Sequence, residues 1–155
     1  MTFKTKYFGE IELDDSKLIT FDNGLFGFEA FKTFALLYDS TTEERPTIQW
    51  LQSTEQESLA LPVMIPTIVM PDYNPIVEDG VLETVGEWSE DTISVLVTLT
   101  VPDDIKLMTT NMKAPIIVNT ATMKGCQVVA ENPDYEIKYA IYPILEAAKK
   151  LKEGN

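Results

Sequence analysis

The sequence predicts a mostly β fold: a small, antiparallel, barrel-like single domain that ends in one α-helix. Short runs rich in β-branched and aromatic residues recur along the chain with turn residues between them. No strand–helix–strand alternation interrupts these runs, and a helical pattern is strong only at the C-terminus. The length of 155 residues suits one domain, 1–155, that can bury a sizeable core.

The first half of the chain reads almost entirely as strands. Residues 5–13 predict two short strands on either side of Gly9. A polar turn at 54–57 separates two of the longer runs. The content of apolar and β-branched residues predicts further strands at 18–21, 33–38, 47–53 and 58–64.

The second half contains the strongest strand, expected at 92–101, where β-branched residues are dense and Pro102 ends the run. Residues 115–121 and 126–130 face each other across 122–125, which is a hairpin pattern. Alternation predicts a strand at 135–142, and a short helical turn is expected at 79–85.

The C-terminal helix is predicted to start at Pro143, because proline is tolerated in a first helical turn. One face of this helix carries the apolar residues Ile144, Leu145, Ala148 and Leu151.

The composition limits the chemistry available to the chain. With no histidine, Ser-His-Asp and Cys-His catalytic systems and imidazole zinc sites are excluded. One cysteine, Cys126, can form neither an internal disulfide nor a thiolate metal cluster. The formal net charge of −13 would repel nucleic acid and attract a basic protein, although it can also serve solubility alone.

No targeting or membrane segment is visible in the sequence. The N-terminus lacks the apolar stretch of a signal peptide, and no apolar run approaches the roughly 20 residues that span a bilayer. The lone cysteine agrees with a reducing compartment. We therefore expect a cytoplasmic protein that binds no membrane and, in the absence of any cofactor motif, no cofactor.

A long segment without basic residues is the clearest anomaly. Residues 46–105 contain eleven acids and neither lysine nor arginine. This segment could be a solvated loop, a landing site for a basic protein or a calcium site, although its spacing does not match an EF-hand loop. The acids crowd most densely at six positions: Glu78, Asp79, Glu83, Glu87, Glu90 and Asp91.

Carboxylates are the one type of catalytic side chain present in number. Adjacent side chains on a strand point to opposite faces, so the neighbouring pairs would not easily share a site. A carboxylate-dependent hydrolase or a metal-binding β-barrel protein therefore remains the alternative, and it requires acids such as Asp72, Asp103 and Asp104 to converge. The adjacent pairs are Asp14-Asp15, Glu43-Glu44 and Asp103-Asp104.

Two apolar stretches could be either core or binding surface. The run FDNGLFGFEAF (21–31) holds four phenylalanines around Gly24 and Gly27, which can supply turn conformations. The run LPVMIPTIVMPDY (61–73) is broken by three prolines, which forbid a continuous helix or a central strand.

Five motifs in a fixed order resemble the FliW family. They are FxxGLxGF (21–28), LQS (51–53), PDY (71–73), NMKAPIIVN (111–119) and GCQVV (125–129). The resemblance covers nearly the whole chain. Phe26 is a departure, since relatives usually have proline at this position.

The resemblance implies a non-enzymatic, small β-barrel-like protein that binds flagellin and CsrA, a basic dimeric repressor of flagellin translation. Flagellin would occupy the protein when abundant. Once released, the protein would bind CsrA away from its RNA-binding surface and antagonise it allosterically. We expect a monomer without direct nucleic-acid contact, although an oligomer with a purely structural role is also compatible with the sequence.

Two sets of residues are the predicted contacts. For CsrA they are the acids Glu78, Asp79, Glu83, Glu87, Glu90 and Asp91. Flagellin is expected to present a helical segment to an apolar groove. Each flagellin candidate could equally be a core residue, and the candidates are Phe26, Phe28, Met64, Ile65, Met70 and Tyr73.

Overall fold

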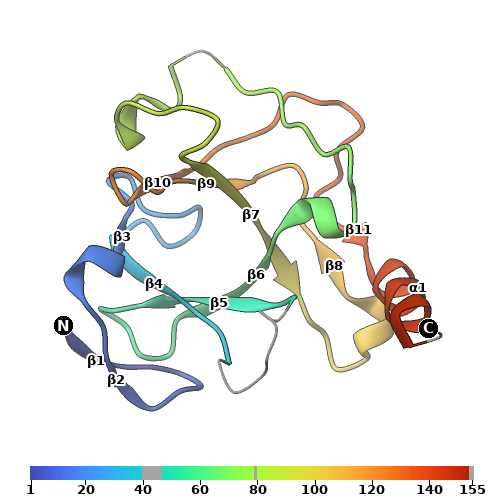
Figure 1. Cartoon of the computed structure of the whole chain (residues 1–155), viewed down its shortest axis with the longest axis horizontal. Helices are drawn as coiled ribbons and strands as arrows, with labels where there is room; N and C mark the ends of the chain where they lie inside the picture. Colours follow the sequence, from blue (N-terminus) through green and yellow to red (C-terminus); the bar gives the residue numbers. More distant parts are fainter. Residues whose placement is uncertain (40–46, 79, 154–155) are drawn as a thin grey trace.

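A closed β-barrel with one C-terminal α-helix forms the described part of the protein, as the sequence predicts (Figure 1). The computed structural model describes residues 1–39, 47–78 and 80–153. Its strands are β1 Thr2–Lys4, β2 Glu10–Glu12, β3 Ile19–Thr20, β4 Thr33–Leu37, β5 Gln49–Ser53, β6 Ala60–Met64, β7 Ile93–Thr100, β8 Thr109–Thr110, β9 Ile116–Asn119, β10 Lys124–Gln127 and β11 Tyr139–Ala140. The helical elements are the 3₁₀ turns η1 Asp15–Lys17, η2 Pro66–Ile68, η3 Glu83–Val85 and η4 Ile105–Leu107, and the α-helix α1 Tyr142–Glu153.

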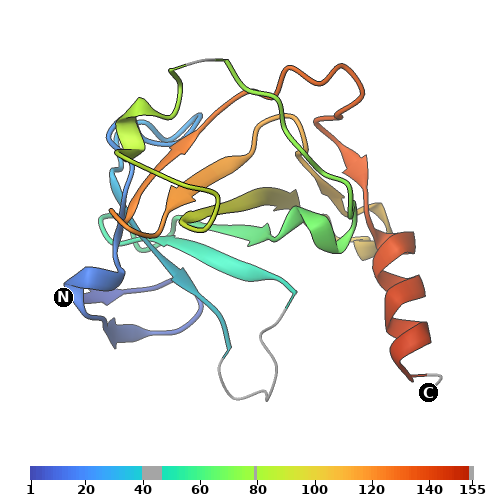
Figure 2. The same cartoon turned by 45° about the horizontal axis from the view of Figure 1, so that its top comes forward.

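Seven strands close the barrel in the order β7-β6-β5-β4-β3-β10-β9, and β9 pairs back with β7. All neighbouring pairs are antiparallel except β3 and β10, which run parallel where Thr20 lies opposite Lys124. Strands β8 and β11 extend the sheet from the end of β7 and lead to α1. The separate hairpin β1–β2 lies at the opposite end of the molecule from α1 (Figure 2).

The core fills the barrel and continues along two of its sides. Inside the barrel, Phe21 and Phe34 meet edge to face and are fully buried with Leu51. A second apolar cluster includes Met64, Val97, Met112 and Ile141, against which α1 packs through Ile144 and Leu145. The third cluster is formed by Val85, Ile117, Cys126 and Val128.

Several element boundaries differ from the predictions. The expected strand at 135–142 shortens to β11, because Tyr135 lies in a turn closed by its N–H donating to Asn132 O. The strand β8 was not predicted, because a strand of only two residues shows no alternating pattern in the sequence. The helical turn expected at 79–85 is the 3₁₀ turn η3, and the C-terminal helix begins at Tyr142.

The hairpin between β9 and β10 also turns earlier than predicted. Asn119 pairs with Lys124, so the turn occupies 120–123, and Met123 takes the left-handed conformation (φ 56°). Gly125 is therefore a strand residue rather than a turn residue. A Cβ at this position would lie 2.5 Å from Phe21 Cε1, so glycine here allows a close approach of the ring to the backbone.

Candidate interaction surface

The loop between β3 and β4 exposes one aromatic side chain. Phe21 and Leu25 are buried, Phe28 is half-buried against the core, and Phe26 is 50% exposed. Gly24 has φ +69°, and a Cβ there would lie 2.5 Å from Glu29 Cα. The left-handed turn and the close backbone approach thus fold the loop back on itself and leave Phe26 at its tip.

Hydrogen bonds fix the backbone of this exposed tip. The Phe26 N–H donates to Gln127 Oε1 (2.8 Å), and Gln127 Nε2 donates to Ala114 O (3.0 Å). The Gly27 N–H donates to Glu29 Oε1 (3.1 Å). Hydrogen bonds from the backbone N–H groups of Glu29 itself and of Gly27 lower the pKa of the Glu29 carboxyl, so this group stays ionised to a lower pH than usual.

The acidic segment, which we define as residues 76–78 and 80–91, is held by hydrogen bonds to other segments at its start and near its end. At its start, the Ile76 N–H donates to Asn132 Oδ1 (2.6 Å), and Ile76 O accepts from the Glu131 N–H (2.6 Å). Near its end, Asn119 Nδ2 donates to Val85 O and to Glu87 O, both at 2.9 Å.

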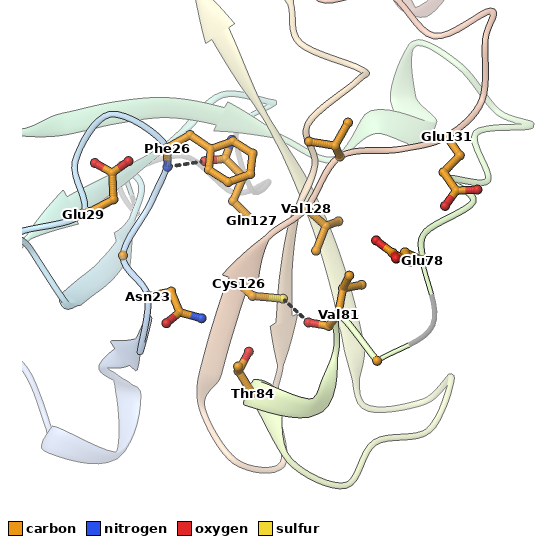
Figure 3. Close-up of a pocket in the computed structure, with 13 residues that line it drawn as sticks. Asn23, Phe26, Glu29, Glu78, Val81, Thr84, Cys126, Gln127, Val128 and Glu131 are labelled. Atoms are coloured by element: carbon orange, nitrogen blue, oxygen red, sulfur yellow. Dashed lines mark hydrogen bonds between the residues drawn. The ribbon is translucent and has the colours of Figure 1, made fainter.

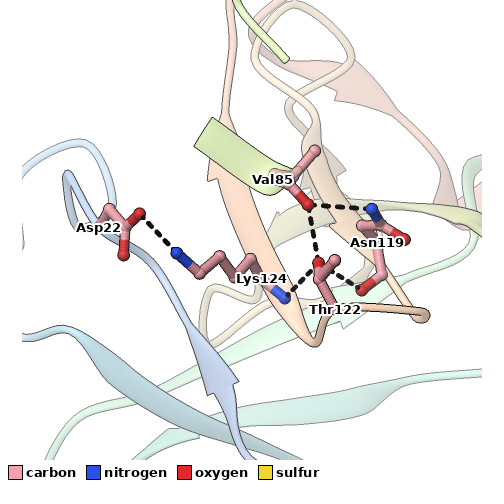
Figure 4. Close-up of polar contacts among 5 residues, drawn as sticks. All are labelled: Asp22, Val85, Asn119, Thr122 and Lys124. Carbon is pink, nitrogen blue, oxygen red and sulfur yellow. Dashed lines mark hydrogen bonds and ion pairs between the residues drawn. The ribbon is translucent and has the colours of Figure 1, made fainter. Parts of the chain in front are cut away.

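The end of the acidic segment receives a further hydrogen bond from the β9–β10 turn. Thr122 Oγ1 donates to Val85 O at 2.7 Å, so this carbonyl accepts from two side chains (Figure 4). Between the two fastened ends, Val77, Val81 and Leu82 pack on the third apolar cluster. The acidic segment is thereby held as a packed wall on the outside of the barrel.

The Phe26 loop and the acidic segment enclose a groove over β10, which we call the Phe26 groove (Figure 3). Its volume is about 780 Å³. Phe26 and Glu29 lie on one side of it, Glu78 and Glu131 lie on the other, and Cys126 lies between (Figure 3). None of the described residues that line this groove is a lysine or an arginine.

A second groove adjoins the first along the acidic segment. Its volume is about 810 Å³, and Glu78 and Gly80 line both grooves. The remaining lining includes Glu83, Glu87 and the 47% exposed Trp88, so we call it the Trp88 groove. The two grooves together present exposed aromatic rings beside carboxylates.

Lys124, on strand β10 beneath the groove, is already paired. Lys124 Nζ lies 3.2 Å from Asp22 Oδ2, at the base of the Phe26 loop (Figure 4). The carboxylates Glu29, Glu78 and Glu131 form no ion pair with a described residue. These carboxylates therefore make no direct ion pair with described residues, although Lys32 lies close enough to Glu29 to contribute to its lowered pKa.

The predicted acidic contacts are all accessible where the structure describes them. Glu78, Glu83 and Glu87 line the grooves, whereas Glu90 and Asp91 are exposed in the turn that precedes β7. Asp79 lies outside the described residues.

The six apolar candidates do not form one groove. Met64 is fully buried in the second apolar cluster, on the face of β6 opposite to the barrel-filling Val63. Tyr73 is buried too, since its hydroxyl donates to Met112 O (2.8 Å) and its ring stacks on Tyr135 at 4.8 Å. That burial raises the pKa of the Tyr73 hydroxyl. Met64 and Tyr73 are therefore core residues, which corrects their assignment as flagellin contacts.

The other apolar candidates differ in accessibility. Phe28 and Met70 are half-buried and pack against the core, so they offer little free surface. Ile65 is exposed and lines a smaller cavity of about 390 Å³ together with Pro75 and Val95. Phe26 and Ile65, the two exposed candidates, thus line separate cavities.

Sequence reasoning missed several residues of the surface. Trp88 stands alone among acids, and this aromatic in a polar run was the available signal. Glu29, Gln127, Val129 and Glu131 carried no local signal, because their role depends on the folding of β10 between two distant segments.

The convergence of acids that a hydrolase requires is not found in the described structure. Asp72, Asp103 and Asp104 are exposed. Asp104 instead caps η4, since its Oδ1 accepts from the Lys106 N–H at 3.1 Å, and Asp14 caps η1 in the same way. The pair Glu43-Glu44 lies outside the described residues.

Two kinds of feature are absent from the described residues. Across 1–39, 47–78 and 80–153, no group of three or more histidine, cysteine, aspartate or glutamate side chains is placed to hold a metal ion. Within the same residues, no helix combines the length and apolar character needed to cross a membrane.

Comparison with known proteins gives consistent matches over almost the whole chain. The family model described as FliW protein matches residues 2–141. The flagellar assembly factor FliW of Lachnoclostridium phytofermentans is 49% identical over 155 residues, covering 100% of this chain and 99% of the relative. That of Thermotoga maritima is 37% identical over 152 residues, covering 97% and 99%.

A solved structure agrees with the sequence matches. The crystal structure of a flagellar assembly factor FliW superposes with a TM-score of 0.83 and 31% sequence identity, and the match covers 92% of this chain and 98% of that one. The chain therefore belongs to the FliW family of flagellar assembly factors.

Proposed function

We propose that the protein is a cytoplasmic, non-enzymatic regulator of flagellar assembly that binds flagellin and, when released from it, binds and allosterically antagonises CsrA. Membership of the FliW family supports the role in flagellar assembly. The observation that carries the binding role is a surface on which exposed aromatic rings lie beside carboxylates that make no ion pair with described residues. Such a surface suits a binding protein better than an enzyme.

The acidic segment is the proposed contact for CsrA, which the family resemblance describes as basic. Glu78, Glu83 and Glu87 line the grooves, and Glu90 and Asp91 extend the negative surface toward β7. Carboxylates of this kind accelerate encounter with a basic partner, and salt screens their effect. Binding of CsrA is therefore expected to weaken as salt is raised.

Flagellin is proposed to bind through exposed apolar side chains. The accessible candidates are Phe26 and Ile65, which line separate cavities. Apolar contacts are much less sensitive to salt than screened charges. The two partners are thus expected to differ in the salt dependence of their affinities.

Titration calorimetry with purified CsrA and purified flagellin of the same bacterium tests this proposal. Heat of binding is expected with each partner, and the affinity for CsrA should fall more steeply with salt than the affinity for flagellin. A chain that is folded by circular dichroism but gives no heat with either partner would contradict the proposed function.

A further inference from the structure

Phe26 is an exposed aromatic residue in a rigid setting. Its side chain is 50% exposed, and Val129, which also lines the Phe26 groove, is 57% exposed. The neighbouring Phe21 and Leu25 are buried, so this loop does place other apolar side chains in the core. Exposed apolar surface gathered in a concave site is typical of a binding surface.

The conformation of the Phe26 loop is largely fixed before any partner arrives. The hydrogen bond from the Phe26 N–H to Gln127 Oε1 (2.8 Å) ties the loop to β10. Gly24 lets the loop pack closely on Glu29. A partner that contacts Phe26 would therefore lose little free energy to ordering this loop, and such preorganisation favours tight binding.

The charges around the groove select the kind of partner. Glu29 on one side, and Glu78 and Glu131 on the other, form no ion pair with described residues. Nucleic acid and anionic lipid would be repelled by these carboxylates. A second copy of this chain, with a net charge of −13, would also be repelled. Charge complementarity thus favours a cationic protein segment.

We propose that the Phe26 groove binds a cationic amphipathic segment of the basic partner. An apolar side chain of that segment would pack on Phe26 and Val129, and a lysine or arginine would reach Glu78 and Glu131 on the opposite side. The inference rests on the proposed function, from which it takes CsrA as the basic partner. It assigns Phe26 to CsrA and leaves the Ile65 surface for flagellin.

The test compares CsrA and flagellin affinities of the full chain and four variants by titration calorimetry at one salt concentration. Phe26→Ala removes the exposed aromatic ring of the groove, and Glu78→Gln removes one of its carboxylate charges. Leu107→Ala is the control for an exposed apolar residue, since Leu107 is 66% exposed at the end of η4. Glu10→Gln, on the exposed hairpin strand β2, is the control for an acid. Circular dichroism and thermal unfolding check that each variant is folded.

Phe26→Ala is expected to weaken CsrA binding by about tenfold or more, as for an aromatic anchor at an interface. Glu78→Gln is expected to weaken it by roughly threefold to tenfold. Both variants should bind flagellin with an affinity within about twofold of that of the parent chain. The two control variants should bind CsrA with an affinity within about twofold of that of the parent chain.

A double variant tests whether Phe26 and Glu78 contact the same segment. If they do, the losses of Phe26→Ala and Glu78→Gln should not add, because either change already displaces the shared segment. Strictly additive losses would contradict a single shared segment.

The outcomes separate this inference from the proposed function. If the parent chain binds neither CsrA nor flagellin, the proposed function fails and the inference fails with it. If the parent chain binds CsrA but both groove variants bind it equally well, only the inference is overturned. The same holds if Phe26→Ala weakens flagellin binding and spares CsrA, since Phe26 would then belong to the other partner.

Discussion

Gly125 lies in β10 where the ring of Phe21 packs directly against its backbone. In a Gly125→Ala variant the new Cβ would lie 2.5 Å from Cε1 and 2.9 Å from Cζ of the buried Phe21 ring. Overpacking of this kind typically lowers the free energy of unfolding by about 1–3 kcal/mol. Urea unfolding of the parent chain and of Gly125→Ala measures the difference.

The matched control for this prediction relieves the clash. Phe21→Leu removes the ring atoms that the new Cβ would meet, at the cost of a poorer core. The double variant Phe21→Leu/Gly125→Ala should therefore lose less stability than the two single losses together. Full additivity would show that the close contact does not limit stability.

Cys126 is the second residue whose surroundings predict a measurable property. Burial raises the pKa of the Cys126 thiol. The folded chain therefore keeps the thiol proton to a higher pH than the unfolded chain. The associated stability is present below the ordinary thiol pKa and is lost as the pH rises through the folded value.

This shift predicts slow chemical modification, because the thiolate is the reactive form. At about pH 8, near the ordinary thiol pKa, Cys126 of the folded chain should react with a disulfide reagent more slowly than the same thiol in urea. The rate of modification is followed by absorbance, and the signal comes from Cys126 alone because the chain has no second cysteine. Equal rates in the folded and unfolded chains would contradict the prediction.

At the scale of elements, the acidic segment depends on the side chain of Asn119 at the end of β9. Asn119 is fully buried, and its Nδ2 group donates to Val85 O and Glu87 O. Asn119→Ala removes both bonds and should lower the free energy of unfolding by about 1–3 kcal/mol. Amide hydrogen exchange should accelerate in 81–88 before it accelerates in the barrel strands.

Thr120→Ala provides the control for this change. Thr120 lies in the adjacent turn, and its exposed hydroxyl donates to Thr92 O at 3.0 Å. Loss of this exposed bond should have little effect on stability and none on exchange in 81–88. If both variants behave alike, Asn119 is not what positions the acidic segment.

Most barrel strands could be predicted from the sequence because each is a local run of β-branched and apolar residues ended by turn residues. The exceptions have physical causes. Strand β8 is two residues long, too short for a periodic pattern. The parallel pair β3–β10 follows from barrel closure and leaves no mark in either strand alone.

The candidate site was predictable only in part. The acids could be found from the sequence, because no lysine or arginine lies near them along the chain. Met64 is buried because β6 packs on apolar clusters on both faces, and Tyr73 is buried because its loop packs on the second of these clusters. Neither arrangement shows as a local periodicity in the sequence. Phe26 and Glu78 line the same groove only because folding brings together two segments that are far apart in the chain.

For the whole molecule, the distribution of charge predicts which surface a basic partner meets. Reversal of Glu87, Glu90 and Asp91 to lysine should slow association with CsrA and spare flagellin, because only the former is expected to be steered by these carboxylates. Stopped-flow association at low and high salt measures the effect, which should shrink as salt is raised.

The control for this prediction is a second triple variant with the same net charge as the first. Reversal of three exposed acids elsewhere, Glu10, Glu12 and Glu57, makes an equal change in total charge. This variant should associate with CsrA faster than the first one. If the two variants are equally slow, total charge decides the rate and the acidic segment has no special part in it.

The parallel seam between β3 and β10 has a consequence for how the protein is made. It joins Thr20 to Lys124, and the Phe26–Gln127 hydrogen bond spans 101 positions of the chain. Strand β3 cannot find this partner until most of the chain has left the ribosome, so a nascent chain carries an open sheet edge until then. Proteolysis of stalled nascent chains should therefore show protection of the N-terminal strands only once residue 127 has emerged. The surface proposed for CsrA would then arise late in synthesis, and incomplete chains would not compete for the repressor.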